Sequence, residues 1–185
     1  MKIKRKHNIR LVKPSLELQS EYMEMVREFV SAGEVMDHKE LQLALEDFPA
    51  YVNNCVKWER GIDLPDKWVP SSTFCLIRDD NVILGTSSLR YKLTDKLRLF
   101  GGHIGYKIRP AQRRKGYGTE ILKLTLIEAG RLGFMRFLVT CDDDNIASAK
   151  IIEKNGGILH DKCDRGDLGK LTRRYWVDLN NLTLT

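Results

Sequence analysis

Apolar and polar residues alternate along Ile104–Ile108, with the period of two that is typical of a strand with one buried face. Pro110 ends this strand, because it cannot donate a ladder hydrogen bond and disfavours helical backbone at the residue before it. From Ile121 to Leu132, apolar residues recur at helical spacing around much of the circumference, which predicts a largely buried helix. A cationic, glycine-containing loop at residues 112–118 joins the strand to the helix.

Upstream of this strand, helical and strand periods follow one another between turn signals. Gly85, Gly101 and Gly102 interrupt strand patterns, which suggests bulges or bends there. The pattern predicts a strand at 9–12, a helix from Ser15 to Gly33, a helical segment at 41–45 that Pro49 breaks or restarts and that continues to Gly61, a strand at 73–77, a hairpin turn at 78–81, a return strand at 82–91, and a strand from Leu97 through the paired glycines into Ile104–Ile108.

Downstream of the long helix, Phe137–Cys141 is a short apolar run typical of a central strand buried on both faces. A helix from Asn145 to Gly156, a strand beginning at 158–160, a turn at 165–167 and a final strand at Leu171–Leu179 complete the pattern. The order of elements predicts a mixed α/β fold, with a central sheet of about six to seven strands flanked by about four helices.

Composition narrows the class of protein. A chain of 185 residues suits a single domain spanning 1–185, and the net charge of +6 comes from interleaved acids and bases. Four widely spaced cysteines and four histidines suggest neither a disulfide framework nor a metal site. A charged start without an apolar run, and no apolar stretch of membrane length, predict a cytoplasmic protein with no membrane partner.

The loop at 112–118 has the chemistry of a phosphate site. The first N–H groups of a helix lack internal partners and lie at the positive end of its dipole. Gly116 and Gly118 allow positive φ and a close backbone approach, while Arg113, Arg114 and Lys115 supply countercharge. These features predict a diphosphate ligand. No P-loop lysine follows Gly118, and Ile121 replaces the third glycine of a dinucleotide fingerprint.

Residues 113–118, Arg-Arg-Lys-Gly-Tyr-Gly, resemble the Gln/Arg-x-x-Gly-x-Gly/Ala signature of the GCN5-related N-acetyltransferase (GNAT) superfamily. The resemblance extends over roughly residues 99–160, through the strand ending at Ile108-Arg109-Pro110 and the later helix that opens at Asn145 and closes with Glu-Lys-Asn-Gly. It implies the GNAT acyl-CoA N-acyltransferase fold, with a cofactor-binding core at about 99–160 and acceptor-side helices at about 15–61.

The resemblance implies direct transfer of acetyl from acetyl-CoA to a primary amine of a small-molecule or peptide acceptor. Backbone N–H groups from Arg114 to Thr119 would hold the pyrophosphate, backbone groups from Tyr106 to Ile108 would pair with pantetheine, and Asn145 would bind pantetheine or the acceptor, or only cap its helix. The expected cofactor-binding residues are Tyr106, Lys107, Ile108, Arg113, Arg114, Lys115, Gly116, Tyr117, Gly118, Thr119, Asn145 and Ser148.

Catalytic groups are harder to place, because Ile152 stands where many relatives carry the tyrosine that protonates the departing thiolate. Tyr106, Tyr175 or water would take that role. His103 is the candidate base, in competition with a structural role. The expected catalytic residues are His103, Asn145, Asp142 and Tyr106, with Asp142 binding the ammonium or capping the next helix, and Cys141 a packed thiol.

The stretch from Gly33 to Pro70 is expected to select the acceptor, with its acids as a cation-recognising rim and Trp58 or Trp68 as an apolar wall, or with Trp58 in the core. A non-catalytic or regulatory CoA-binding domain is the first alternative function. The basic N-terminus is read as solvated rather than as a nucleic-acid arm, because no aromatic-rich basic face accompanies it. A homodimer using Tyr175–Leu179 is a further expectation.

Overall fold

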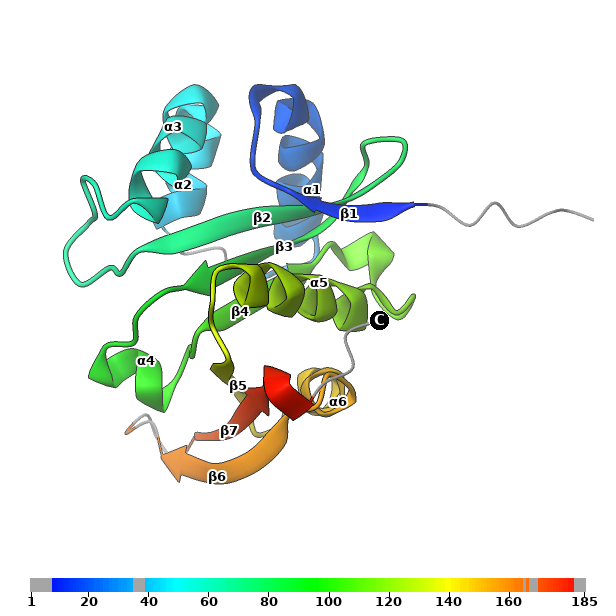
Figure 1. The fold of residues 1–185 in the computed structure, drawn as a ribbon. Coiled ribbons are helices and arrows are strands. Elements are labelled where there is room, and N and C mark those ends of the chain that lie inside the picture. The colour runs from blue at the N-terminus through cyan, green and yellow to red at the C-terminus, as the bar shows by residue number, and fades with distance from the viewer. Residues whose placement is uncertain (1–7, 35–38, 165, 167–169, 182–185) are drawn as a thin grey trace, which may run out of the picture.

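The computed structural model describes residues 8–34, 39–164, 166 and 170–181. One mixed sheet runs through the molecule in the strand order β1-β2-β3-β4-β5-β7-β6 (Figure 1). Neighbouring strands are antiparallel except for the parallel pair β4 and β5. The strands are β1 (Ile9–Val12), β2 (Ser71–Arg78), β3 (Ile83–Arg90), β4 (Ile104–Ile108), β5 (Arg136–Asp142), β6 (Ile158–Asp164) and β7 (Leu171–Asp178).

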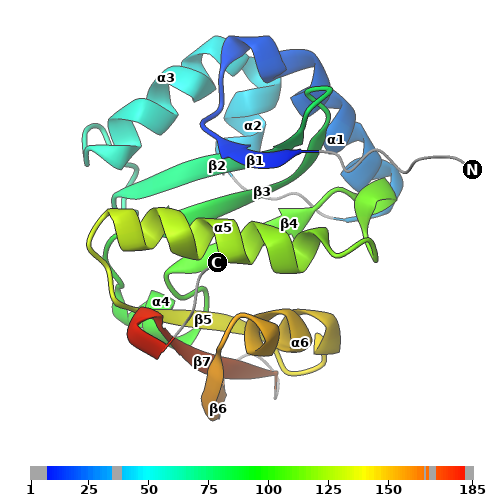
Figure 2. The same ribbon diagram turned by 45° about the vertical axis from the view of Figure 1, so that its right-hand side comes forward.

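Helices cover the sheet on both faces. The helices α1, α2 and α3 lie over one face of the β1–β4 half, and α5 crosses the other face with α6 beside β5 and β7 (Figures 1 and 2). The α-helices are α1 (Gln19–Ser31), α2 (Lys39–Glu46), α3 (Phe48–Glu59), α4 (Asp95–Leu99), α5 (Tyr117–Arg131) and α6 (Ile146–Lys154), and the short 3-10 turns are η1 (Leu16–Leu18), η2 (Pro110–Gln112) and η3 (Leu179–Asn181).

The alternation of side chains along β2 builds two cores. Cys75 and Ile77 pack with α1–α3, whereas Phe74 and Leu76 pack on the side of α5. The expected central strand is also confirmed, because Phe137, Leu138 and Val139 of β5 are all buried. Both halves of the sheet are therefore fixed by apolar contacts on two faces.

The two halves of the sheet meet through a short contact. β4 and β5 share one register pair, Ile104 with Val139, and the His103 N–H extends it by donating to the Leu138 carbonyl over 2.7 Å. Beyond this pair the strands separate, as Figure 2 shows. The two strands therefore splay apart and leave a gap beside Tyr106 and Ile108 (Figure 2).

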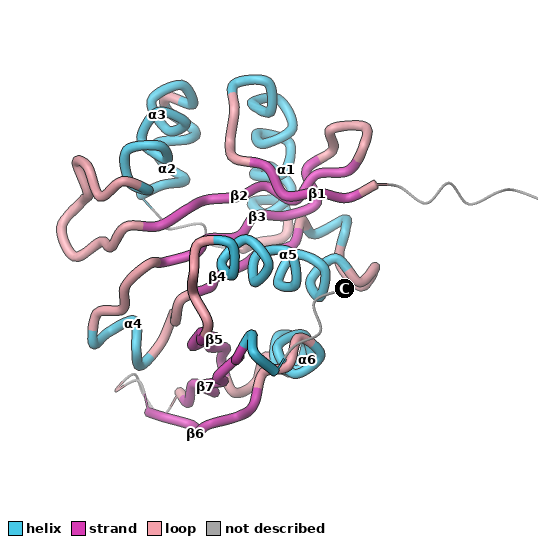
Figure 3. The backbone as a smooth tube through the Cα atoms, viewed as in Figure 1, coloured by secondary structure: helices cyan, strands magenta, loops and turns pink. Residues whose placement is uncertain are grey.

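The expected strand from Leu97 is wrong, because these residues form the short helix α4 (Figure 3). The Thr94 side chain caps it by accepting a hydrogen bond from the Leu97 N–H over 3.2 Å. Gly101 and Gly102 then turn the chain with φ of 106° and 59°. A Cβ at Gly102 would lie 2.4 Å from the Leu138 carbonyl oxygen, so this glycine also permits the close approach to β5.

Of two other helix starts, one has a side-chain cap and one does not. Asp47 accepts a hydrogen bond from the Ala50 N–H over 2.9 Å, so Pro49 stands in the first turn of a restarted helix. Ser15 makes no side-chain cap, and the chain forms η1 before α1 begins at Gln19.

The last strand occupies the interior of its half of the sheet. β7 lies between β5 and β6, and Tyr175 and Val177 are fully buried in the core. These side chains are therefore not available for the dimer interface expected at Tyr175–Leu179. The turn expected at 165–167 falls mainly outside the described residues, and no described helix has the length and apolar character of a membrane span.

Candidate active site

The loop before α5 presents a row of backbone donors. Arg114 and Gly116 adopt left-handed φ of 60° and 88°, and the N–H groups of Thr119 and Glu120 turn back to the Gly116 carbonyl. The five N–H groups of residues 114–118 have no acceptor within the described part of the chain. Backbone donors that converge in this way at a helix N-terminus form an anion site.

The two glycines of the loop are needed for different structural reasons. Gly116 provides the left-handed turn, as expected. Gly118 does not adopt positive φ; instead, a Cβ there would lie 2.6 Å from Cδ1 of Ile151, so it lets α6 pack against the start of α5.

The three cations of the loop are not equivalent. The Arg113 guanidinium binds the Glu34 carboxylate, with Nη2 to Oε2 at 2.9 Å, and its Nε donates to the Ile108 carbonyl over 3.0 Å. This bond lowers the pKa of Glu34. The Lys115 ammonium donates to the Ala111 carbonyl over 2.8 Å. Arg114 is exposed and makes no side-chain hydrogen bond or ion pair within the described residues, so it is the cation best placed to meet a ligand.

The backbone of β4 points into the gap between the two halves of the sheet. The Arg90 N–H donates to the His103 carbonyl and the Arg109 N–H donates to the Leu84 carbonyl, so alternate residues of β4 bond to β3. In an antiparallel ladder the intervening residues, here Tyr106 and Ile108, direct their backbone groups to the other side. An extended ligand arm can pair with them there.

Tyr106 also reaches across this gap with its side chain. Its hydroxyl and the Ser148 hydroxyl of α6 lie 2.8 Å apart, and the Ser148 N–H donates to Oδ1 of Asn145 over 3.0 Å. Asn145 is thus the cap of α6, one of the two roles expected for it. Burial raises the pKa of Tyr106 to about 12, so the phenol keeps its proton. Burial likewise raises the pKa of Cys141 to about 11.

The remaining expected catalytic residues are His103, where β4 and β5 meet, and Asp142, at the end of β5. Nδ1 of His103 accepts a hydrogen bond from the Leu138 N–H over 2.9 Å, and burial lowers the pKa of the ring. Asp142 is exposed at the end of β5, where its carbonyl accepts the Asn145 N–H. Ile152 is fully buried.

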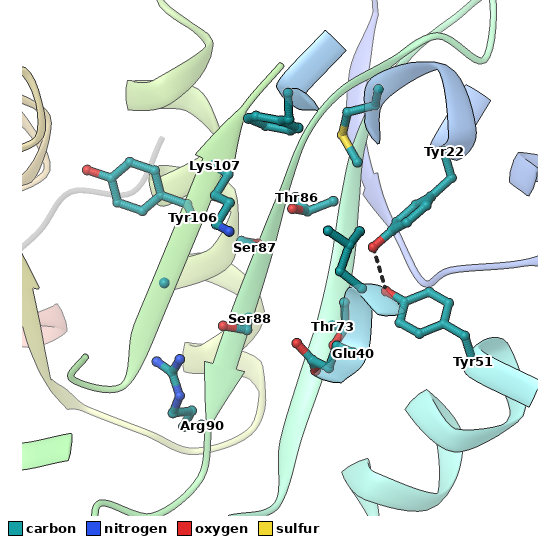
Figure 4. A pocket seen from close by; sticks show the side chains of 14 residues that line it. Tyr22, Glu40, Tyr51, Thr73, Thr86, Ser87, Ser88, Arg90, Tyr106 and Lys107 are labelled. Carbon is teal, nitrogen blue, oxygen red and sulfur yellow. Dashed lines mark hydrogen bonds between the residues drawn. The ribbon is translucent and has the colours of Figure 1, made fainter. Parts of the chain in front are cut away.

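A cavity of about 280 Å³ lies on the opposite side of β4, under the helices α1–α3 (Figure 4). The stretch from Gly33 to Pro70, expected to select the acceptor, supplies Glu40, Leu41 and Tyr51 to its wall, while eight of the fourteen lining residues come from strands. Trp58 and Trp68 are absent from its wall; their rings pack together 5.1 Å apart, and Trp58 is in the core. The cavity is lined by Tyr22, Met25, Phe29, Glu40, Leu41, Tyr51, Thr73, Thr86, Ser87, Ser88, Arg90, Gly105, Tyr106 and Lys107.

Three ionisable side chains give this inner cavity its electrostatic character. Burial raises the pKa of Glu40, and the positive charges of Arg90 and Lys107 offset part of that rise. Burial lowers the pKa of both Arg90 and Lys107. The Tyr22 hydroxyl donates to the Tyr51 hydroxyl over 3.3 Å at the wall, and burial raises the pKa of both phenols. Glu40 is one of the acids expected to form a cation-recognising rim between Gly33 and Pro70, whereas Arg90 was missed by sequence reasoning.

A second cavity of about 760 Å³, the outer cavity, adjoins the first. Glu40, Ser88 and Arg90 line both, while residues 66–69 and 94–97 form the outer wall. The outer cavity is therefore continuous with the inner one at these three residues.

The sequence model of the acetyltransferase (GNAT) domain matches residues 10–158. The chain belongs to the GNAT acetyltransferase family. Among curated proteins, none matches this GNAT acetyltransferase in sequence.

Solved structures of similar fold span nearly the whole chain. A GNAT-family acetyltransferase from Bacillus anthracis is 21% identical, with a TM-score of 0.63 over 98% of this chain and 100% of that chain. RimL, a ribosomal-protein α-N-acetyltransferase in complex with coenzyme A, is 15% identical, with a TM-score of 0.69 over 93% and 94%. MccE, a microcin self-immunity acetyltransferase in complex with acetyl-CoA and AMP, is 17% identical, with a TM-score of 0.64 over 92% and 92%. These likenesses confirm the GNAT fold and its mixed sheet.

The acetyl donor of this GNAT acetyltransferase is acetyl-CoA, as the family assignment implies. The residues of the candidate site fit acetyl-CoA. The open N–H groups of 114–118 suit a pyrophosphate, and the backbone of Tyr106 and Ile108 suits the amides of the pantetheine arm.

Proposed function

We propose that this protein is an N-acetyltransferase that moves the acetyl group of acetyl-CoA directly to a primary amine in a ternary complex. One observation carries the proposal: β4 separates two sites of different character. Gly105 and Lys107 border the inner cavity. Tyr106 also lines that cavity, but its hydroxyl reaches Ser148 at the gap, which continues past Ile108 to the loop at 114–118. A thioester in the gap and an amine in the cavity would meet at this strand. The amine-acetylating activity in the name of RimL also supports an amine acceptor.

In the proposed reaction the amine nitrogen attacks the thioester carbonyl carbon. The N–C bond forms, the C–S bond breaks, and coenzyme A leaves as a thiolate. A backbone N–H of β4 would stabilise the oxyanion that develops on the carbonyl oxygen. Holding the reactants on either side of one strand supplies the proximity that a bimolecular reaction lacks.

The proton of the acceptor ammonium needs a base, and Glu40 suits this role. Its carboxylate faces the inner cavity (Figure 4), and burial raises its pKa toward that of a useful base. His103 was the base expected from the sequence; its Nδ1 already accepts a backbone hydrogen bond, and it is outside the cavity lining. We therefore assign proton acceptance to Glu40.

The departing thiolate needs a proton, and Tyr106 suits this role better than Tyr175. The Tyr106 hydroxyl lies at the gap with Ser148, where it can donate a hydrogen bond to the thiolate; burial raises its pKa, which keeps the phenol protonated and makes it a weak acid. The Tyr175 hydroxyl donates to Glu153 over 3.1 Å. The thiolate is a good leaving group, so this proton transfer assists the reaction without being essential to it.

The test measures release of the coenzyme A thiol from acetyl-CoA in the presence of a panel of primary amines. A sequential kinetic pattern is expected, and Cys141→Ala should retain activity because no acyl-cysteine is formed. A ping-pong pattern abolished by Cys141→Ala would overturn direct transfer. Tight binding of acetyl-CoA without turnover of any amine would instead support the regulatory CoA-binding alternative.

A further inference from the structure

Two opposite charges face the inner cavity without pairing with each other. Glu40 of α2 and Arg90 of β3 both line it, and each influences the protonation of the other. Within the described residues, no ion pair joins the two side chains. In Figure 4 both point into the cavity, with Ser88 on the strand between them.

Arg90 has unused hydrogen-bonding capacity. Its Nη1 donates to the carbonyls of Gly101 and Gly102 over 3.1 and 3.2 Å, while Nε and Nη2 have no hydrogen-bond partner among the described residues. Gly105 lies beneath the guanidinium, since a Cβ there would be 3.7 Å from both terminal nitrogens. A guanidinium fork binds carboxylate or phosphate groups, and leaving a cation in a partly buried wall without a counterion is costly.

The surroundings favour an anion near Arg90 and a cation near Glu40. Lys107 adds a second positive charge on the same face of the sheet. Among the residues that the structure describes, Glu40 is the acid of this wall, since Glu34 is bound to Arg113. The hydroxyls of Thr86 and Ser88 line the space between the charges.

From this arrangement, and resting on the proposed function, we infer that the acceptor is a small zwitterion: a primary amine that carries a carboxylate or phosphate group on the same molecule. The anionic group binds Arg90 and the amine binds Glu40. The inner cavity of about 280 Å³ has room for a molecule of amino-acid size. The outer cavity is continuous with it.

The test compares matched acceptors in the thiol-release assay with the full chain and saturating acetyl-CoA. The pairs are L-leucine with isoamylamine, L-phenylalanine with phenethylamine, and O-phosphoethanolamine with ethanolamine. The first two pairs probe a carboxylate and the third probes a phosphate. In at least one pair, kcat/KM for the anionic member is expected to exceed that of its partner by about tenfold or more, as one charge-assisted hydrogen bond predicts.

Variants link the preference to Arg90. Arg90→Gln is expected to lower kcat/KM for the anionic member by about 10- to 100-fold more than kcat/KM for the matched neutral-tailed amine. Arg131→Gln is the matched control, because Arg131 is exposed on α5 and pairs with Glu128. Arg90→Lys keeps the charge without the fork and should give an intermediate loss. Thermal unfolding shows whether Arg90→Gln folds. If it does not fold, Arg90→Lys replaces it as the test variant.

The outcomes separate this inference from the proposed function. If the wild type acetylates the decarboxylated or dephosphorylated partners as well as the anionic members, the zwitterion inference is overturned and acetyl transfer to amines stands. If no amine is acetylated, the proposed function fails, and calorimetric titration of the same six compounds into the CoA-bound protein decides the inference. If an anionic member binds to the wild type and no longer binds to Arg90→Gln, the inferred anion site at Arg90 stands. If no anionic member binds to the wild type, or if Arg90→Gln binds it equally well, the inference is overturned.

Discussion

Replacing Gly102 with alanine should damage the contact between the two halves of the sheet. Gly102 has φ of 59°, and an added Cβ would lie 2.4 Å from the Leu138 carbonyl oxygen. Gly133 provides a matched control, because it has φ of 84° and no atom within 4 Å of the added Cβ. The left-handed conformation costs alanine about 1 kcal/mol in each variant.

The clash adds a second cost at Gly102 alone. A backbone carbonyl cannot move aside without disturbing two hydrogen bonds between His103 and Leu138, of 2.7 and 2.9 Å. At about 1 kcal/mol each, these bring the loss for Gly102→Ala to about 3 kcal/mol, against about 1 kcal/mol for Gly133→Ala. For a chain of this size, each kcal/mol lowers Tm by about 2–4 °C, so the expected decreases are about 6–12 °C and 2–4 °C.

Urea unfolding of the wild type and both variants measures these differences, with thermal melts as a second probe. Gly102→Ala should also weaken acetyl-CoA binding, because the same residue holds β4 against β5 at the closed end of the gap. Equal losses of stability in the two variants would refute the reasoning, since they would show that only the backbone conformation matters.

Three further outcomes test the site and its support. Arg109→Met should destabilise the fold by about 2–4 kcal/mol in urea unfolding. The buried Arg109 guanidinium binds the carboxylates of Glu21 and Glu28 of α1 at 2.9 and 2.7 Å, and the substitution removes the cation from both ion pairs. A loss of stability below about 0.5 kcal/mol would contradict this. The rate of acetyl transfer should fall as pH decreases through the raised pKa of Glu40, because protonation of its carboxylate removes the base. This acidic limb of the pH–rate profile should be absent from the residual activity of Glu40→Gln. An unchanged limb in that variant would exclude Glu40 as the titrating group. Tyr106→Phe should lower kcat by about tenfold with little change in the KM of acetyl-CoA, and equal activity would rule out its role as the acid.

The sequence by itself determined the features that depend on neighbouring residues. The period of two and Pro110 placed β4, and the Gly116 loop before an apolar helix predicted the anion site, because turn conformation and helix ends are set within a few residues. Asn145 was expected as a possible cap for the same reason. Thr94 gave an equally local signal for α4, but the apolar residues after it were read as a strand.

Only the tertiary structure decided which charged groups meet. Arg113 carries the loop signature, yet it binds Glu34 far upstream in the chain. Glu40 and Arg90 lie fifty positions apart and become neighbours because α2 packs over β3 and β4. Such contacts arise from the packing of helices on the sheet, and no periodicity in the sequence encodes which polar side chain then faces which cavity.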